Sequence, residues 1–239
     1  MSSTESEDHA LLRQSVAGLG EALAALGRYG SDATEIRRAN ALGAVVPWAD
    51  NHHWIDAAAV PVGTTTPSTG EQLPHCLWTS SGAPDGRREQ PEVAMPAMAR
   101  ELPEPETGSE RNEAGTVGAA EFGEIGALND LAYRQQALGP LLAAFPPEVG
   151  HGYGIRDHSG RLVSAAVALD VGSDTSVQWV VTHPDHRRQG LSARLLQVLL
   201  AEARGRGQRT ATLQSSPDGF SLYQRLGFRT VGTLRAYVN

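Results

Sequence analysis

Apolar residues near the N-terminus recur at the spacing of a helix. Over residues 8–27 they fall at alternating four- and three-residue steps, at Leu12, Val16, Leu19, Leu23 and Leu26. This spacing predicts an amphipathic helix that buries one face. Four strand-like pieces follow, separated by turn residues, at 44–46, 53–62, 75–79 and 93–102. No catalytic motif stands out in this part of the chain.

A stretch rich in proline, glutamate and glycine occupies residues 102–115. After it, the pattern of apolar positions becomes more regular. We expect a linker at 106–115 between an N-terminal region, 1–105, and a C-terminal domain, 116–239. In the C-terminal part the pattern predicts helices at 121–135, 190–204 and 219–226, and strands at 150–156, 161–169, 175–182, 209–214 and 228–238. This order predicts a mixed α/β fold, with an antiparallel meander that passes into a crossover unit.

Composition narrows the class of protein. The 239 residues are 40% hydrophobic and 20% charged, which is typical of a globular protein. A formal net charge of −7 argues against a nucleic-acid partner, and no apolar run approaches the ~18 residues of a membrane span. The single cysteine, Cys76, suits a reducing compartment, and the acidic, polar start lacks the features of a signal peptide. We therefore expect a cytoplasmic protein with no membrane partner.

The most informative segment is residues 179–196. A β-branched run ends at a proline turn, two arginines and Gly190 follow, and an apolar-periodic helix begins. A helix N-terminus offers free backbone N–H groups and the positive end of the helix dipole, and arginine adds a charged fork for phosphate oxygens. The sequence therefore predicts an anion site at this turn, with phosphate as the expected guest.

Three motifs stand in order in the C-terminal part of the chain: Trp179-Val-Val-Thr-His-Pro-Asp-His186, Arg187-Arg-Gln-Gly-Leu-Ser-Ala193 and Leu222-Tyr-Gln-Arg-Leu-Gly-Phe228. Together they resemble the GNAT superfamily of N-acetyltransferases, and the resemblance covers roughly residues 116–239. It implies a central mixed sheet flanked by helices. It also implies transfer of an acetyl group from acetyl-CoA to a primary amine, by direct attack in a ternary complex and without a metal.

The resemblance also implies roles for single residues. The strand that ends at Thr182 would splay from residues 210–214 and pair with the pantetheine arm, and the amides of the following loop would hold the pyrophosphate. Ser192 and Ser216 stand where the family more often has glycine and asparagine. Tyr223 occupies the position of the general acid that protonates the departing thiolate. The cofactor-binding residues implied are Val180, Val181, Thr182, Arg187, Arg188, Gln189, Gly190, Leu191, Ser192, Ala193 and Ser216.

The acceptor side of the reaction is much less defined by the sequence. Gln178 stands on the strand where a glutamate sometimes serves as the base, but an amide cannot accept a proton at neutral pH. The candidates for the base are His151, Asp170, Glu121 and Glu124, with a water chain as an equal alternative. Trp179 and Glu124 are candidates for contact with the substrate. The histidine pairs, His52 with His53 and His183 with His186, lack the further ligands that a metal site needs.

The N-terminal region loosely resembles the degenerate acetyltransferase-like half that precedes some bacterial GNAT domains. It has no counterpart of the Arg187–Gly190 turn, so we expect no acyl-CoA binding there. Covering a sheet edge, shaping the acceptor pocket and forming a homodimer contact all remain open for it. The alternative for the whole chain is a catalytically silent module that senses acyl-CoA or supports a partner. The sequence does not identify the acceptor.

Overall fold

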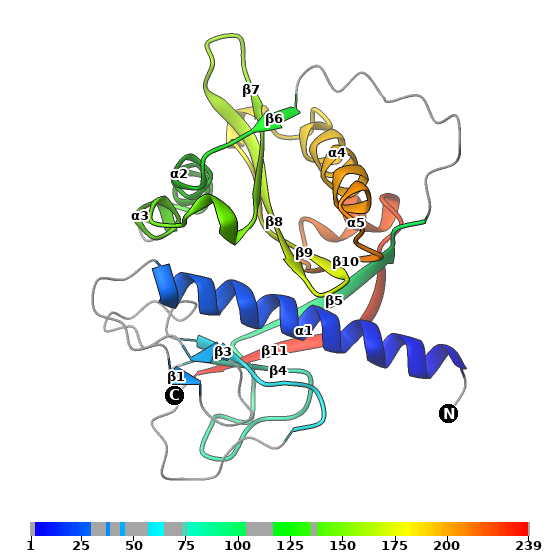
Figure 1. Cartoon of the computed structure of the whole chain (residues 1–239). Helices are drawn as coiled ribbons and strands as arrows, with labels where there is room; N and C mark the ends of the chain where they lie inside the picture. The colour runs from blue at the N-terminus through cyan, green and yellow to red at the C-terminus, as the bar shows by residue number, and fades with distance from the viewer. Residues whose placement is uncertain are drawn as a thin grey trace. The chain divides into compact units, whose positions relative to one another are not determined.

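The computed structural model describes residues 3–29, 37–38, 44–45, 57–64, 74, 76–103, 117–134 and 138–238. They fall into two compact units: the first contains Met1–Arg100 and Thr212–Asn239, and the second contains Glu101–Ala211. Both units combine helices with β-strands, so the predicted mixed α/β class is confirmed (Figure 1). None of the helices in the described ranges has the length and apolar character of a membrane span.

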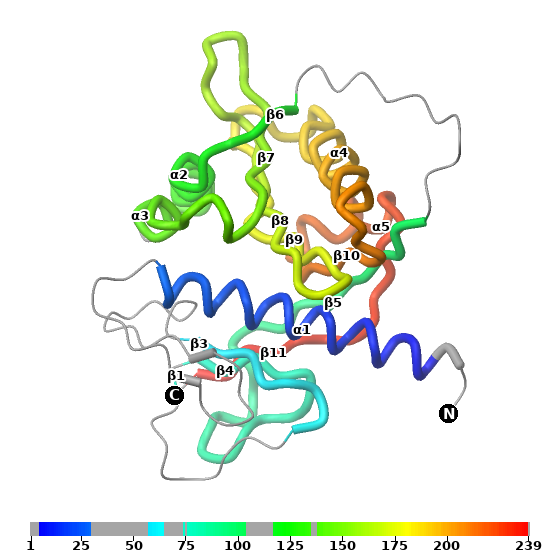
Figure 2. Tube along the Cα trace, viewed as in Figure 1, coloured from blue at the N-terminus to red at the C-terminus, as the bar shows by residue number. Residues whose placement is uncertain are grey.

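The first unit places the last strand of the chain among strands from its N-terminal part. Its strand order is β3-β4-β11-β5, with β3 parallel to β4 and β11 antiparallel to both of its neighbours. In Figure 2 the red C-terminal strand runs beside strands of the N-terminal region. The elements are α1 (Ser3–Tyr29), β1 (Arg37–Arg38), β2 (Ala44–Val45), β3 (Ala57–Ala59), β4 (Cys76–Thr79), β5 (Val93–Glu101), α5 (Phe220–Arg225) and β11 (Arg229–Val238).

Helix α1 is longer than the sequence pattern predicts, since it begins at Ser3 and ends at Tyr29. Its apolar stripe is buried as expected, with Val16, Leu19, Leu23 and Leu26 among the core residues. The helix contacts β3 and β11. Gln214 donates hydrogen bonds to the carbonyl and the hydroxyl of Ser15, at 3.1 and 2.9 Å. Burial of the stripe, rather than helix propensity alone, therefore holds α1 in place.

The second unit is built on an antiparallel meander in the order β6-β7-β8-β9. Gly152 lies against Ile125 of α2, whereas its neighbour Tyr153 is hydrogen-bonded to Arg206 just beyond α4. Because successive strand residues point to opposite faces, α2 and α4 cover opposite faces of this sheet (Figure 1). The elements are β6 (Val117–Ala119), α2 (Phe122–Tyr133), α3 (Leu138–Ala143), η1 (Pro147–Val149), β7 (His151–Arg156), β8 (Leu162–Val171), β9 (Asp174–Thr182), η2 (Pro184–His186) and α4 (Leu191–Gly205).

Two elements of the second unit were not predicted from the sequence. Strand β6 has only three residues, and α3 has only six, including a glycine and a proline. Helix α3 is fixed instead by tertiary contacts, because Asp130 accepts hydrogen bonds from the backbone N–H groups of Leu138 and Gly139 at 3.0 and 2.7 Å. Strand β10 (Thr210–Gln214) carries the chain from the second unit back to the first.

The compact units do not follow the chain order of the predicted domains, because residues 212–239 group with the N-terminal region. The pairing of β11 with β4 and β5 accounts for this grouping. The predicted linker, 106–115, lies outside the described residues. The limits 1–105 and 116–239 stay a prediction.

Candidate functional site

Strand β9 contains a bulge next to the residues that the sequence assigns to a cofactor. Its register with β8 pairs Ala165 with Val181 but Val167 with Gln178, so β9 has one residue more than β8 over this interval. Within the bulge Trp179 has a φ of 49°. A bulky residue at positive φ is rare and strained, and such strain is often found at functional sites. The bulge also takes backbone polar groups out of the ladder with β8, where a ligand can reach them.

The chain after β9 forms a tight turn that ends at the start of α4. His183 Nδ1 accepts a hydrogen bond from the N–H of Asp185 at 3.3 Å, and η2 follows. Arg188 and Gly190 then adopt positive φ values of 61° and 75°. Gly190 is the N-cap of α4 and provides no side-chain cap. The first N–H groups of α4 therefore have no acceptor within the helix and are open to an anion.

A chain of hydroxyl groups ties the end of β9 to the first turn of α4. The Ser164 and Thr182 hydroxyls are 2.9 Å apart, and those of Thr182 and Ser192 are 2.7 Å apart. Ser164 also donates to the carbonyl of Val181 at 3.1 Å. These contacts fix where the helix start lies relative to the bulge. The hydroxyl of Ser192 thus has a structural role here that a glycine could not fill.

The two arginines of the turn have different surroundings. Arg187 donates to the carbonyl oxygens of Thr182 and of Ala132 in α2, both at 3.4 Å. Arg188 is exposed, and no partner in the described part of the chain engages its guanidinium. Arg187 therefore holds the turn against α2, while Arg188 is available to an anion.

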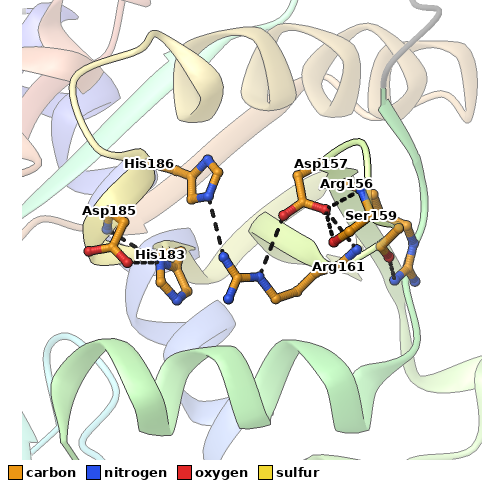
Figure 3. A network of polar contacts seen from close by, with 8 residues as sticks. Arg156, Asp157, Ser159, Arg161, His183, Asp185 and His186 are labelled. Atoms are coloured by element: carbon orange, nitrogen blue, oxygen red, sulfur yellow. Dashed lines mark hydrogen bonds and ion pairs between the residues drawn. The ribbon is translucent and has the colours of Figure 1, made fainter.

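A second polar network supports η2 from the β7–β8 hairpin (Figure 3). Asp157 accepts hydrogen bonds from Ser159 and from the N–H of Arg161, and the Ser159 hydroxyl is the largest cause that lowers the pKa of the Asp157 carboxyl. Arg161 lies 3.5 Å from Asp157 and 3.4 Å from His186. The rings of His183 and His186 meet edge to face at 5.6 Å.

These histidine contacts lie within the turn. No group of three potential metal ligands occurs among the residues that the structure describes. His52 and His53 lie outside them.

The four candidate bases are in different electrostatic states. Glu124 forms an ion pair with Arg156, with N–O distances of 2.6 and 2.9 Å, and this contact lowers the pKa of the Glu124 carboxyl. Burial works to raise the pKa of Asp170, but hydrogen bonds from Arg206 and Thr175 outweigh it and lower the pKa. An arginine thus engages each of these two carboxylates, and the lowered pKa makes each a weak proton acceptor. Glu121 and His151 are the two other candidates.

Glu121 and His151 line one cavity of about 500 Å³ in the second unit. Its walls come from β6, the start of α2, the segment after α3, the start of β7 and Glu202 of α4. His151 lies 3.6 Å from Asp170. Glu202 and Tyr153 were not predicted at this cavity, because neither residue lies in a recognisable motif.

Gln178 and Trp179 lie on β9 itself. Gln178 is buried and donates a hydrogen bond to the Ser176 hydroxyl at 2.8 Å. The ring of Trp179 meets Phe145, a residue of the cavity wall, edge to face at 6.0 Å. Trp179, predicted to contact the substrate, therefore adjoins the cavity, whereas Glu124 is not among the lining residues.

Tyr223 and Ser216 lie in the first unit. Tyr223 is buried in α5, and its ring meets Phe228 edge to face at 6.0 Å. A side chain at Gly219 would come within 2.7 Å of this ring, so glycine is needed for the close approach. Ser216 accepts a hydrogen bond from the N–H of Gly219 at 3.3 Å. The roles predicted for both residues stay predictions.

Comparison with known proteins agrees with this geometry. Residues 153–237 match the family model described as "Acetyltransferase (GNAT) domain". An uncharacterized N-acetyltransferase of Porphyra purpurea, ycf52, is 38% identical over 73 residues, which are 30% of this chain and 42% of that protein. The chain thus spans less than half the length of this relative.

Solved structures share the fold. A GNAT-family protein from Novosphingobium aromaticivorans superposes with a TM-score of 0.50 and 23% identity, over 68% of this chain and 72% of that one. A Drosophila protein superposes with a TM-score of 0.50 and 14% identity, over 69% and 61% of the two chains. At these identities the likeness concerns the fold alone.

Proposed function

We propose that the protein transfers an acetyl group from acetyl-CoA to a primary amine, and the match of residues 153–237 to the GNAT acetyltransferase model supports this proposal. The observation that carries this proposal is the backbone of residues 179–190. It combines a bulge at Trp179 with a turn through Arg188 and Gly190 at positive φ, and it ends at an uncapped helix start. We infer a cytoplasmic location from the single cysteine of the sequence, which suits a reducing compartment.

The residues of this segment fit a thioester of coenzyme A. The N–H groups at the start of α4 and the exposed Arg188 suit a pyrophosphate. The backbone of Val180, Val181 and Thr182 suits an extended amide-containing arm, which would pair with it as an added strand. The bound thioester would supply an activated acyl carbon, and a backbone N–H at the bulge would donate to the oxygen on which charge develops.

The transfer is a direct attack in a ternary complex. The amine nitrogen forms a bond to the acyl carbon, the carbon–sulfur bond breaks, and the thiolate takes a proton. From its place in the motif Leu222–Phe228, Tyr223 is the proton donor, and Ser216 is a further cofactor contact. The proton that the amine loses passes through water to Glu121 or His151, because arginines already engage Asp170 and Glu124.

A catalytically silent acyl-CoA sensor is the second candidate. Gln178 favours it, because this amide stands on β9 where a base could serve and is already bonded to Ser176. We retain the enzyme as the first candidate because the cavity beside Trp179 gives an acceptor a place to bind.

Thiol release from acetyl-CoA, measured against a panel of primary amines, tests the two candidates. The enzyme releases thiol with at least one acceptor in proportion to the acetylated amine formed. The sensor binds acetyl-CoA in the same preparation and releases no thiol with any amine. Loss of release in the double variant Glu121→Gln with His151→Asn, but not in Glu124→Gln, would support the assignment of the proton acceptor.

A further inference from the structure

The cavity of the second unit has the size of a small-molecule site. Its volume of about 500 Å³ lies within the usual range for such pockets. Gly152 allows the wall to close tightly, since a side chain there would come within 2.1 Å of the carbonyl oxygen of Ala120. Glu121 follows directly and lies at the N-terminus of α2, so the wall places a carboxylate at a fixed point.

The charged groups of the cavity are mainly acidic. Glu121 and Glu202 both line it and are exposed. The nearby arginines are already paired. Arg206 is engaged by Asp170 at 2.8 and 3.1 Å and by the Tyr153 hydroxyl at 2.9 Å. Arg156 interacts with Glu121 but is paired with Glu124 at 2.6 and 2.9 Å. Burial is the largest cause that raises the pKa of Tyr153 to about 12, so this hydroxyl, which also interacts with Glu202, stays neutral. The carboxylates of Glu121 and Glu202 therefore leave an excess of negative charge at the cavity, and a positively charged guest is favoured.

An aromatic path leads from the cavity to the bulge of β9. Phe122 and Phe145 both line the cavity and meet edge to face at 5.7 Å, and Phe145 also contacts Trp179 at 6.0 Å. These rings provide an apolar surface for a hydrocarbon spacer and a favourable face for a cation.

The strand register sets the distance between the two places. His151 of β7 pairs with Ala168 of β8, which pairs with Val177 of β9, two residues before Trp179. Neighbouring strands lie ~4.8 Å apart and successive residues of a strand ~3.3 Å apart, so His151 in the cavity wall and the bulge are separated by roughly 12 Å. One elongated molecule can therefore place an amine at the bulge and a charged group in the cavity.

We propose that the acceptor is an organic dication, with one ammonium group held in the cavity by Glu202 and its other amine presented at the bulge of β9. This proposal rests on the proposed acetyltransferase function and adds the class of substrate. It concerns recognition of the end of the acceptor that does not react. At the reacting amine, bonds form and break as in the proposed acetyl transfer.

The test compares linear diamines of increasing chain length with the monoamine of each length. Thiol release should show a length optimum for diamines, and at that length kcat/KM should exceed that of the monoamine by at least tenfold. In Glu202→Gln, which keeps the shape of the side chain, KM for the best diamine should rise about fivefold while kcat and the KM of the monoamine stay unchanged. Calorimetric titration of the same diamine without acetyl-CoA should show a matching loss of affinity.

Glu148→Gln is the matched control, because Glu148 is an exposed carboxylate in η1 that does not line the cavity. It should leave both constants unchanged. Equal turnover of monoamines and diamines, or equal losses in Glu202→Gln and Glu148→Gln, would overturn the proposal while leaving the acetyltransferase function intact. Acetyl-CoA binding without thiol release for any amine would instead overturn the proposed function and this inference with it.

Discussion

The donor segment, residues 179–193, and the acceptor cavity use different parts of the polypeptide. The donor segment is a backbone site, made by positive φ values at Trp179, Arg188 and Gly190 and by the free N–H groups of α4. The acceptor cavity is a side-chain site, in which Glu121, His151 and Glu202 converge from three elements. A backbone site suits a ligand that is always the same, whereas a side-chain site can change its guest by substitution without disturbing the fold.

We expect the largest effect from a substitution that impairs the chemical step rather than the binding of either ligand. Tyr223→Phe should lower kcat by about a hundredfold, because the phenyl ring keeps the packing against Phe228 but has no proton to give the thiolate. Steady-state thiol release and calorimetric titration of acetyl-CoA would be measured on the same preparation.

The dissociation constant of acetyl-CoA should stay unchanged in this variant. Phe228→Leu, which alters the packing partner and keeps the hydroxyl of Tyr223, is the matched control. A Tyr223→Phe protein with unaltered kcat would remove the tyrosine from the mechanism.

Gly190→Val should impair the backbone site and leave the side-chain site intact. A β-branched residue is strained at a φ of 75°, so the turn must rearrange, at a cost of about 2 kcal/mol in cofactor binding. This corresponds to an increase of about thirtyfold in the dissociation constant of acetyl-CoA, measured by calorimetry. Diamine affinity in the absence of acetyl-CoA should not change.

Gly172→Val tests whether strain alone has this effect, since Gly172 also has a positive φ, 62°, but lies in the β8–β9 turn. It should lower the melting temperature without weakening acetyl-CoA binding. Equal weakening in the two variants would contradict the backbone site.

Arg188→Ala should also weaken acetyl-CoA binding, but by less than Gly190→Val. Removal of an exposed guanidinium should raise the dissociation constant of acetyl-CoA about fivefold at low salt, and less at high salt, because counterions screen an exposed charge. Calorimetric titrations at several salt concentrations would measure this. Arg194→Ala removes an exposed arginine of α4 beyond the turn and should have the weaker effect; the reverse order would count against Arg188.

Asp170→Asn should have the smallest effect, because it changes a residue that supports the cavity and does not line it. The folded-state pKa of Asp170 is lowered, so its carboxylate stabilises the fold above its ordinary pKa and this contribution is lost as the pH falls through the lower folded value. The wild type should therefore exceed the variant in unfolding free energy by about 1 kcal/mol at neutral pH, with the difference declining progressively as the pH falls below about 4.

Denaturant unfolding at a series of pH values would measure the difference for Asp170→Asn. Asp218→Asn, at an exposed turn position, should give no comparable loss. A difference between wild type and Asp170→Asn that persisted at acidic pH would show that the carboxylate charge is not responsible.

The turn that leads into α4 could be predicted from the sequence because its geometry requires particular residues at consecutive positions, while its role as the donor site stays a prediction. The helix start, the glycine at Gly190 and the basic turn can all be recognised in the order of residues. The acceptor cavity could not be predicted as a site, although Glu121 and His151 were among the candidates for the base. Glu202 stands 51 residues after His151 in the chain, and only the packing of α4 on β7 brings both to one cavity.

The elements of the fold also differ in how well the sequence predicts them. Long amphipathic elements such as α1 and α4 were predicted because their own apolar stripes determine them. Short elements such as β6 and α3 were missed, since contacts with Asp130 and with β7 stabilise them rather than their own residues. The grouping of β11 with N-terminal strands also depends on pairing between segments more than a hundred residues apart.

Calorimetric titration of acetyl-CoA into the purified, folded protein is the most direct test of the donor site. We expect one binding event per chain, with an affinity that falls about thirtyfold in Gly190→Val and is kept in Gly172→Val. Absence of binding to the folded wild-type protein would contradict the assignment of residues 179–193, and the proposed acetyl transfer would fall with it.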